Sequence, residues 1–395
     1  MTMDIRGKTI RSNKKIGSGR VREFRLGCNR RFFQITTFCP DVIGPGPTHL
    51  YLIEDDVLIL VDTGLPTVMA KKMFYHWRHQ PIPPDIDELP DDYSEQELFS
   101  ALTLTGHDVS EIDFILLTHG HLDHFYLGRR IIDLSGAKVA AHIADSSQIC
   151  NPWGMTAMWS EKMPALMAMG MPPPAHSGGK VMIRSEVTDF ALPIDCPIIS
   201  DGPLGMNGFK KESMQVLHVP GHSPGSIALL LSDQNGDRVM LCGDTLLYPI
   251  TPLPSDLITY LRSLKKMKHL NNVKLVLPAH GKAITRLHNR IDFLEKHHRH
   301  RLKLTYEACR KPKSIWQIAT MPKYFDVFID PQKFNPLAGQ EAYVHVELLH
   351  LAGGLHLSHI DGIVHHFRNS GENFEEVYRR AMDIIDNEKT TLLLR

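Results

Sequence analysis

The segment Thr118-His119-Gly120-His121-Leu122-Asp123-His124 places three imidazoles and one carboxylate within six residues. It follows directly on Asp113–Thr118, a short apolar run that is typical of a strand buried on both faces. Burying such side chains without partners would be costly, and a loop at the end of a strand is where they can converge on a metal ion. Imidazole and carboxylate together suit zinc or a similar first-row ion. The segment therefore predicts a metal site at the end of a buried strand.

Further ligand-type residues also stand at the ends of predicted strands. His222 follows the strand 215–219, Asp244 follows 238–242, and His280 follows 274–277. An earlier strand ends in Val61-Asp62-Thr63-Gly64. Because parallel loop ends at one sheet edge bring their side chains together, we expect these residues to meet the imidazoles of 119–124.

These motifs, in this order, resemble those of the metallo-β-lactamase superfamily. The resemblance spans about residues 45–285 and implies an α/β fold, a four-layer αββα sandwich. The matching motifs are Val61-Asp62-Thr63-Gly64, the HxHxDH pattern of 119–124, Val219-Pro220-Gly221-His222-Ser223-Pro224-Gly225, Cys242-Gly243-Asp244-Thr245 and Pro278-Ala279-His280-Gly281.

The resemblance also implies a role for each residue. His119, His121 and His222 would hold one metal ion, Asp123, His124 and His280 a second, and Asp244 would bridge the two. Asp62 would lie outside the ligand set and orient a ligand histidine or the backbone. Two divalent ions, zinc by expectation with manganese or iron as alternatives, would then supply a metal-bound hydroxide to a hydrolase. Asp123, Asp244 and His280 are the expected catalytic residues.

The chain changes character from about residue 314. Ile315–Ala319, Glu341–Leu351 and Glu372–Asp386 are predicted helices, and Leu355–Phe367 is a predicted hairpin with Asp361-Gly362 at its turn. This order is similar to that of lactamase-beta-like proteins with a C-terminal winged-helix domain, some of which are endoribonucleases. We expect an N-terminal extension over 1–31, a catalytic domain over 32–285 with an insert at 145–210, a connecting helix over 286–313 and a winged-helix-like domain over 314–395.

The composition limits the partners and the cellular location that we expect for the protein. The 395 residues have equal numbers of basic and acidic side chains, which gives no global attraction to nucleic acid or anionic membrane. The six cysteines have no metal-type spacing and are expected to be reduced and mostly buried. Neither a secretory signal nor a run of about 20 apolar residues is visible, so we expect a cytoplasmic protein with no membrane span. Secreted antibiotic hydrolysis is thereby disfavoured, and a homodimer stays open.

Three function classes fit the sequence. The first is hydrolysis of a small ester, thioester or lactone. The Met- and Trp-rich stretch 145–179 favours it, if this stretch forms an apolar wall over the site. The alternative is that its side chains simply fill the core. The second is RNA phosphodiester cleavage, supported by the basic stretch 261–313 and the C-terminal unit. The third is a mono-iron sulfur dioxygenase on the same fold.

Other histidines are expected to have no catalytic role. The run His297-His298-Arg299-His300-Arg301 is interpreted as the solvated face of a long helix that pairs with acidic segments. The remaining C-terminal histidines have no spacing matched to the family, and they are expected to be structural or superficial, with His345 alone a candidate for the rim of the site. They are His345, His350, His356, His359, His365 and His366.

Overall fold

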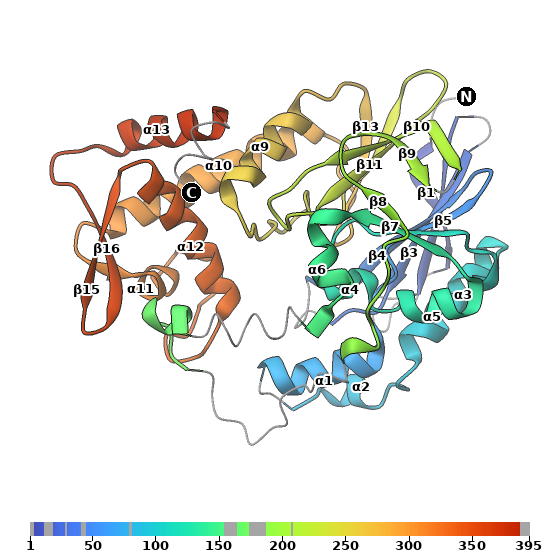
Figure 1. The fold of residues 1–395 in the computed structure, drawn as a ribbon, viewed down its shortest axis with the longest axis horizontal. Coiled ribbons are helices and arrows are strands. Elements are labelled where there is room, and N and C mark those ends of the chain that lie inside the picture. The colour runs from blue at the N-terminus through green and yellow to red at the C-terminus, as the bar shows by residue number, and fades with distance from the viewer. Residues whose placement is uncertain are drawn as a thin grey trace. The chain divides into compact units, whose positions relative to one another are not determined.

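The computed structural model describes residues 4–11, 19–27, 30–40, 45–78, 81–153, 164–173, 187–206 and 208–387 (Figure 1). The chain divides into two compact units. The first comprises residues 1–156, 177–252 and 270–287, and the second comprises 157–176, 253–269 and 288–395.

The first unit is built on two sheets. The larger sheet has eight strands in chain order, antiparallel from β1 to β5 and parallel from β5 to β8. The smaller sheet has the order β13-β12-β11-β10-β9, in which only β12 and β13 run parallel. The strands are β1 Asp4–Arg11, β2 Arg20–Leu26, β3 Arg30–Thr37, β4 Thr48–Glu54, β5 Leu58–Val61, β6 Phe114–Leu116, β7 Lys138–His142, β8 Cys196–Ile198, β9 Gly202–Met206, β10 Phe209–His218, β11 Ile227–Ser232, β12 Arg238–Leu241 and β13 Val273–Leu277.

Alternation along the central strands explains the layers. Ile59 and Val61 of β5 belong to the core between the two sheets, whereas Leu58 and Leu60 face the opposite core. That second core is closed by helices α1 (Thr67–Arg78), α3 (Tyr93–Thr105) and α5 (Gly128–Ser135), which supply residues such as Met69, Leu98 and Ile131. Figure 1 shows these helices along one side of the sheets. Short helical turns complete the unit: α2 Pro84–Asp87, η1 Val109–Glu111, α4 Leu122–Phe125, η2 Ile143–Asp145 and α6 Ser146–Ile149.

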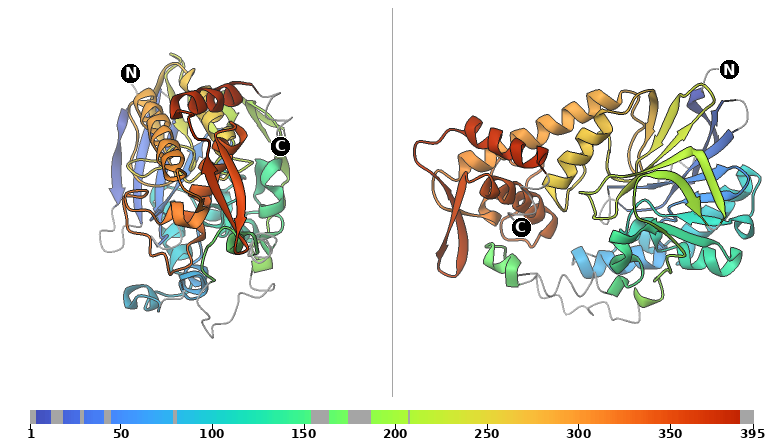
Figure 2. Two further views of the ribbon diagram at one scale, coloured as in Figure 1. Left: turned by 90° about the vertical axis from the view of Figure 1, so that its left-hand side faces the viewer. Right: turned by 45° about the horizontal axis from the view of Figure 1, so that its top comes forward.

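The second unit is mainly helical. Its helices are accompanied by a small sheet of order β14-β16-β15. Figure 2 shows α13 running along α9 and α10, where Arg299 of α10 donates to Glu375 and Arg262 of α9 donates to the carbonyl of Ile385. The elements are α9 Leu257–Lys268, α10 Leu287–Ala308, β14 Lys313–Ser314, α11 Ile315–Ala319, α12 Pro336–Leu351, β15 Leu355–Ile360, β16 Ile363–Arg368 and α13 Phe374–Asp386.

The mixed α/β class expected from the sequence is confirmed, and so are most individual elements. Strand β6 lies where the apolar run 113–118 predicts it, and α11 has the predicted bounds. The hairpin β15–β16 turns at Asp361 and Gly362, whose φ angles of 52° and 78° are those of a two-residue hairpin turn.

The N-terminal strands are the main difference. Residues 1–31 are predicted as an extension, whereas β1 and β2 extend the large sheet, with Phe24 paired to Phe32. In β2 the apolar Val21, Phe24 and Leu26 are buried among arginines. The high arginine content conceals this apolar set in the sequence.

The methionine-rich stretch is described only in part. Met155, Met158 and Met163 lie outside the described residues. Residues 164–173 belong to the second unit, where the carbonyl of Met169 accepts a hydrogen bond from the backbone of Trp316. Residues 164–173 therefore pack beside α11, and the expected role of the stretch as a wall over the metal site is untested.

Two smaller expectations concern cysteines and membranes. Cys39, Cys150, Cys196, Cys242 and Cys309 form no disulfide, and all but Cys150 are buried, while Cys28 lies outside the described residues. Among the helices that the structure describes, none combines the length and apolar character needed to cross a bilayer.

Candidate metal centre

The first group of histidines stands on the loop after β6. The chain leaves the strand at Leu116, and His121 is the residue before the short helix α4, which carries Asp123 and His124. The side chains fold inward, with His119 Nε2 3.0 Å from His121 Nδ1. His119 and His124 are buried, and their ring centres lie 4.0 Å apart.

Three other loops bring the remaining predicted ligands to this point. The ring centre of His222, from the β10–β11 loop, lies 4.5 Å from that of His121. Asp244 follows β12 and His280 follows β13, so their placement reflects the parallel pairing of these two strands. The donor atoms form three groups whose members lie within 4.8 Å of one another: His119–His121–His222, His119–His124–Asp244 and Asp123–His124–His280. All seven predicted ligand residues are thus brought together.

Asp244 occupies the centre of this arrangement. Its Oδ2 lies 3.6 Å from His222 Nε2 and 3.8 Å from His124 Nε2, and its Oδ1 lies 3.7 Å from His280 Nε2. His280 Nε2 is also 3.2 Å from Asp123 Oδ2. A carboxylate with imidazoles of both groups around its two oxygens has the placement that a bridging ligand needs.

Asp62 takes the supporting position that the sequence predicts for it. Its Oδ2 accepts hydrogen bonds from His124 Nδ1 at 2.9 Å and from the Thr118 hydroxyl at 2.8 Å, and its Oδ1 accepts from the Thr118 backbone at 2.8 Å. The Thr118 hydroxyl in turn lies 3.1 Å from His119 Nδ1. His280 is held similarly by its Nδ1, 3.0 Å from the carbonyl oxygen of Gly46. These contacts leave the Nε2 atoms of His119, His124 and His280 directed at the centre.

Burial and mutual charge shift the pKa values in this group. Burial alone would raise the pKa of Asp123, but the neighbouring His124 and His280 outweigh it and lower the value to about 2. Burial would also raise the pKa of Asp244, but the neighbouring His280 and His124 outweigh it and lower this pKa strongly. Burial would lower the pKa of His124, and the carboxylates of Asp123, Asp62 and Asp244 reverse this and raise it well above the ordinary value. The centre therefore stabilises positive charge among its carboxylates.

The donor set fits divalent metal ions. His124 Nε2, His280 Nε2 and Asp244 Oδ1 are buried and have no hydrogen-bond partner among the described residues. With zinc–ligand bonds of about 2.1 Å, tetrahedral donors lie roughly 3.4 Å apart. The separations of 3.0 Å between His119 and His121 and 3.2 Å between Asp123 and His280 are close to this spacing. Inward-facing donors at metal-type separations are what a cation would pair.

Sequence analysis missed one residue of this region, Asp145. Its buried carboxylate accepts the backbone N–H of Gly120 at 2.8 Å and that of Gly225 at 2.7 Å, one from each of two ligand-bearing loops. The sequence signal was faint, because Asp145 lies just beyond β7 in a helical turn with no ligand-type neighbours except His142.

The histidine run of α10 lies in the second unit and corrects an expectation. His297–Arg301 is predicted to be a solvated face, yet His298 and Arg301 are buried, while Arg299 and His300 are exposed. The reason is helical periodicity, which turns two of the five side chains inward. His298 Nδ1 lies 3.1 Å from Nε2 of the buried His345.

The remaining C-terminal histidines agree with a structural or superficial role. His350, His356 and His359 are exposed, and His365 is half-buried. His366 is buried within β16.

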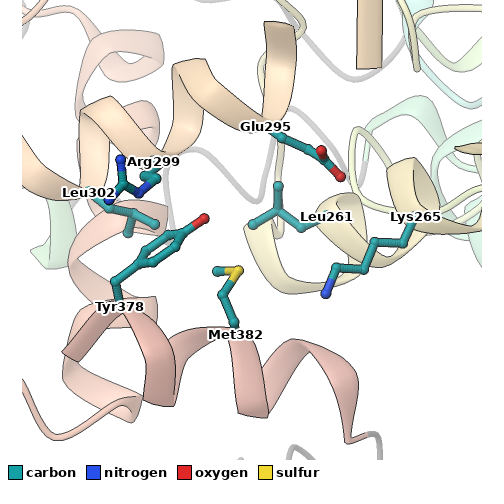
Figure 3. Close-up of a pocket in the computed structure, with 7 residues that line it drawn as sticks. All are labelled: Leu261, Lys265, Glu295, Arg299, Leu302, Tyr378 and Met382. Carbon is teal, nitrogen blue, oxygen red and sulfur yellow. The ribbon is translucent and has the colours of Figure 1, made fainter. Parts of the chain in front are cut away.

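A cavity of about 180 Å³ also lies in the second unit, between α9, α10 and α13 (Figure 3). Its lining mixes apolar side chains with Lys265, Arg299 and Glu295, each of which already has a partner of opposite charge: Asp386, Glu375 and Lys268 respectively. Exposed ion pairs of this kind contribute little to stability.

Comparison with known proteins identifies the family. The model of the metallo-beta-lactamase superfamily matches residues 43–280, more than half of the chain. The chain belongs to the metallo-β-lactamase superfamily. It is accordingly a metal-dependent hydrolase by family.

Solved metallo-β-lactamase structures support the same fold. A metallo-beta-lactamase family protein from Thermus thermophilus superposes with a TM-score of 0.65 at 21% identity, covering 86% of this chain and 98% of its own. A beta-lactamase domain protein from Burkholderia ambifaria gives 0.63 at 21% identity, covering 90% and 97%. Among curated relatives, an uncharacterized protein of Mycobacterium tuberculosis is 27% identical over 179 residues, which is 43% of this chain and 70% of the relative.

Proposed function

We propose that the protein is a binuclear metal-dependent hydrolase of a small ester, thioester or lactone. The observation that carries the binuclear part is the position of Asp244, whose two oxygens face imidazoles of both ligand groups at 3.6–3.8 Å. A carboxylate in that place can bridge two ions.

The proposed ligands follow from the same geometry. His119, His121 and His222 would hold one ion, and Asp123, His124 and His280 would hold the other, with Asp244 shared. A metal pair of this kind supplies Lewis acidity and a water that ionises near neutral pH, and zinc is the proposed metal because imidazole and carboxylate are its ordinary ligands.

The chain's own residues would prepare the centre in two ways. Asp62 and the carbonyl of Gly46 each accept from the Nδ1 atom of a ligand histidine, which fixes the ring orientation and directs Nε2 inward. Burial of His119, Asp123 and His280 excludes water from their sides away from the substrate. Asp123 and Asp244 are ionised at neutral pH, because the surrounding imidazoles hold their pKa values low.

The RNA phosphodiesterase alternative loses support in the second unit. Two basic side chains of the stretch 261–313 are paired with carboxylates: Lys268 pairs with Asp292 and Glu295, and Arg299 pairs with Glu375. Phosphate binding relies on lysine and arginine that are free to neutralise it. We therefore keep the small-molecule proposal.

The organisation of the C-terminal part is also a proposal. The order β14, α11, α12, β15, β16 supports a winged-helix-like domain over 314–395, joined by the helix 286–313 to a catalytic domain over 32–285.

Metal analysis combined with a substrate screen tests the function. Purified protein is assayed for zinc, manganese and iron, then for turnover of acyl thioesters, lactones, a chromogenic phosphodiester and single-stranded RNA. We expect two metal equivalents and turnover of a thioester, ester or lactone. RNA cleavage with no turnover of those substrates would contradict the proposal, and a single iron with no zinc would favour the dioxygenase.

A further inference from the structure

One carboxylate outside the ligand set joins two of the ligand-bearing loops. Asp145 is only 1% exposed and lies on the turn after β7. Its Oδ2 accepts the N–H of Gly120 at 2.8 Å and the hydroxyl of Ser223 at 2.6 Å, and its Oδ1 accepts the N–H of Gly225 at 2.7 Å. Gly120 stands between His119 and His121, and Ser223 follows His222 directly. One side chain thus connects both loops that would hold the first metal ion.

Two glycines of the family motifs make this approach possible. A Cβ atom at Gly225 would lie 2.6 Å from Asp145 Cγ and 2.8 Å from its backbone nitrogen, closer than real carbon contacts allow. At Gly120 a Cβ atom would lie 3.1 Å from Asp145 Cβ and 2.9 Å from Gln148 Oε1. At Gly225 the contact with Asp145 therefore excludes a side chain, whereas at Gly120 a Cβ atom would require Asp145 and the end of the Gln148 side chain to shift. Neither glycine has a positive φ, so a left-handed backbone is not the reason.

The other ligand group has different supports. His124 is oriented by Asp62 at 2.9 Å, and His280 by the carbonyl oxygens of Gly46 at 3.0 Å and Pro47 at 3.1 Å. Within the described residues, the hydrogen bonds of Asp145 go to Gly120, Ser223 and Gly225, and not to Asp123, His124 or His280. Asp145 is therefore placed to affect one group and to leave the other unchanged.

We propose that Asp145 is a positioning residue that sets the distance between the His119–His121 loop and the His222 loop, and thereby the affinity of that one metal position. The proposal rests on the binuclear centre proposed above. Charge matters as well as shape, because three donors converge on two carboxylate oxygens, and hydrogen bonds to an ionised acceptor are about twice as strong as neutral ones.

The substitution Asp145→Asn separates this role from simple packing. The amide keeps the shape of the side chain but has one acceptor oxygen and an NH₂ group. Whichever way the amide turns, its NH₂ faces at least one backbone N–H, of Gly120 or of Gly225, and leaves that donor buried and unpaired. The two loops then lose their common acceptor.

Asp113→Asn is the matched control. Asp113 precedes β6, at the opposite end of the strand from His119, and its Oδ2 accepts the backbone N–H of Leu58 at 2.8 Å. This variant also removes a carboxylate that accepts a backbone N–H, but it does so far along the strand from every proposed ligand.

The experiment titrates metal-free full-length protein with Zn²⁺ in competition with a chromophoric chelator, and Co²⁺ absorption follows coordination. Hydrogen exchange of the Gly120 and Gly225 amides in the metal-free protein reads the Asp145 contacts without any metal. For wild type and Asp113→Asn we expect two tight equivalents. For Asp145→Asn we expect one tight equivalent, a second weakened about 10- to 100-fold, and faster exchange at both glycines.

The outcomes separate the two proposals. A wild-type protein that does not take up two Zn²⁺ equivalents overturns the binuclear centre, and the role of Asp145 falls with it. Two wild-type equivalents together with unchanged or equally weakened binding at both positions in Asp145→Asn overturn the role of Asp145 alone. If that variant does not fold, Ser223→Ala removes only one of the three hydrogen bonds. It should weaken the same single position about threefold, since that is the effect of roughly 0.7 kcal/mol, within the range for one hydrogen bond.

Discussion

Two clusters of buried histidines, one in each unit, differ in their balance of charge. The first gathers His119, His121, His124, His222 and His280 around the carboxylates of Asp62, Asp123 and Asp244. The second gathers His297, His298 and His345 around Glu341, with the guanidinium of Arg301 close by. Both have donor atoms at metal-type separations, so distance alone does not distinguish them.

The pKa shifts differ between the two clusters for only some of the histidines. In the first cluster the pKa values of His124 and His280 are raised, whereas burial lowers those of His119 and His121. In the second cluster those of His297, His298 and His345 are all lowered. In the first, burial opposes protonation of His280, but Asp244 and Asp123 reverse this and raise its pKa. In the second, burial lowers the pKa of His345 to about 3, and burial together with Arg301 lowers that of His297 to about 4. Burial also raises the pKa of Glu341 to about 7. The three carboxylates of the first cluster therefore favour a bound cation more than the single Glu341 of the second does, and the number of carboxylates per imidazole is a better guide to a metal site than distance alone.

The largest expected effect comes from removing ligands of the first cluster. His121→Ala or Asp244→Ala should reduce turnover by roughly three orders of magnitude or more, as for groups that act as one catalytic unit. The fold should be retained, since the sheets below these loops are unchanged. Steady-state kinetics, metal analysis and circular dichroism check this. Survival of both activity and metal content in His121→Ala would show that the ligand assignment is wrong.

The next largest effect is expected from metal removal, which should show which of the two clusters binds the metal. Because a bound ion stabilises the folded state by mass action, Zn²⁺ at 100 times its Kd should add about 2.7 kcal/mol per site to the free energy of unfolding. A chelator should abolish this gain, as followed by thermal unfolding. The variant His298→Ala should show the same Zn²⁺-dependent gain as wild type, whereas His121→Ala should lose much of it. Loss of the gain in His298→Ala alone would assign the metal to the second unit.

A pH effect is expected from Glu341 in the second cluster. Its folded pKa of about 7 lies above the ordinary glutamate value of 4.5, so its contribution to stability is present at low pH and is lost as the pH rises from about 4.5 to 7. Glu341→Gln removes this loss. Relative to wild type, the variant should therefore be more stable at pH 8 than at pH 5 by about 2 kcal/mol, by linkage. Denaturant unfolding at the two pH values measures the difference, and a variant that tracks wild type across the range would refute a neutral buried carboxyl.

The smallest effect should come from Arg299, the exposed neighbour of buried Arg301. Arg299 pairs with Glu375 at 2.8 Å with nearly half of its side chain exposed, and its guanidinium lies over the ring of Tyr378. Exposed pairs of this kind contribute about 0–1 kcal/mol. Arg299→Ala should therefore lower the free energy of unfolding by no more than about 1 kcal/mol, and high salt should reduce the difference further. A loss of several kcal/mol would mean that the cavity of Figure 3 is a structural centre of its unit.

The metal centre was largely predictable from the sequence, because its residues are dense and stand at strand ends. His119, His222, Asp244 and His280 each follow a short apolar run, and the structure places them together. Strands buried on both faces, such as β5 and β6, are continuous apolar runs that are easily recognised.

Residues that act through long-range contacts were not predictable in the same way. Asp145 contacts the ligand-bearing loops only because β7 pairs with β6 and the His222 loop lies against it. No local sequence pattern indicates such a contact. Strand β2 was missed because arginines alternate with its apolar residues. The burial of His298 and Arg301 was not predicted, because the charge of the run 297–301 was considered and its helical periodicity was not.

The φ angle and the hydrogen bonds of Asp62 limit which amino acid the centre can accept at this position. Its φ of 59° lies in the left-handed region, which costs a residue with a side chain about 1–2 kcal/mol and is easiest for glycine and asparagine. Its two oxygens nevertheless serve three donors, from Thr118 and His124, which neither glycine nor asparagine could fully satisfy. The backbone conformation thus favours glycine or asparagine at this position, whereas the hydrogen bonds to Thr118 and His124 favour aspartate. Asp62→Asn or Asp62→Gly would ease the backbone, but either would leave a buried donor of Thr118 or His124 without its acceptor, which costs about 1–3 kcal/mol and cancels the gain.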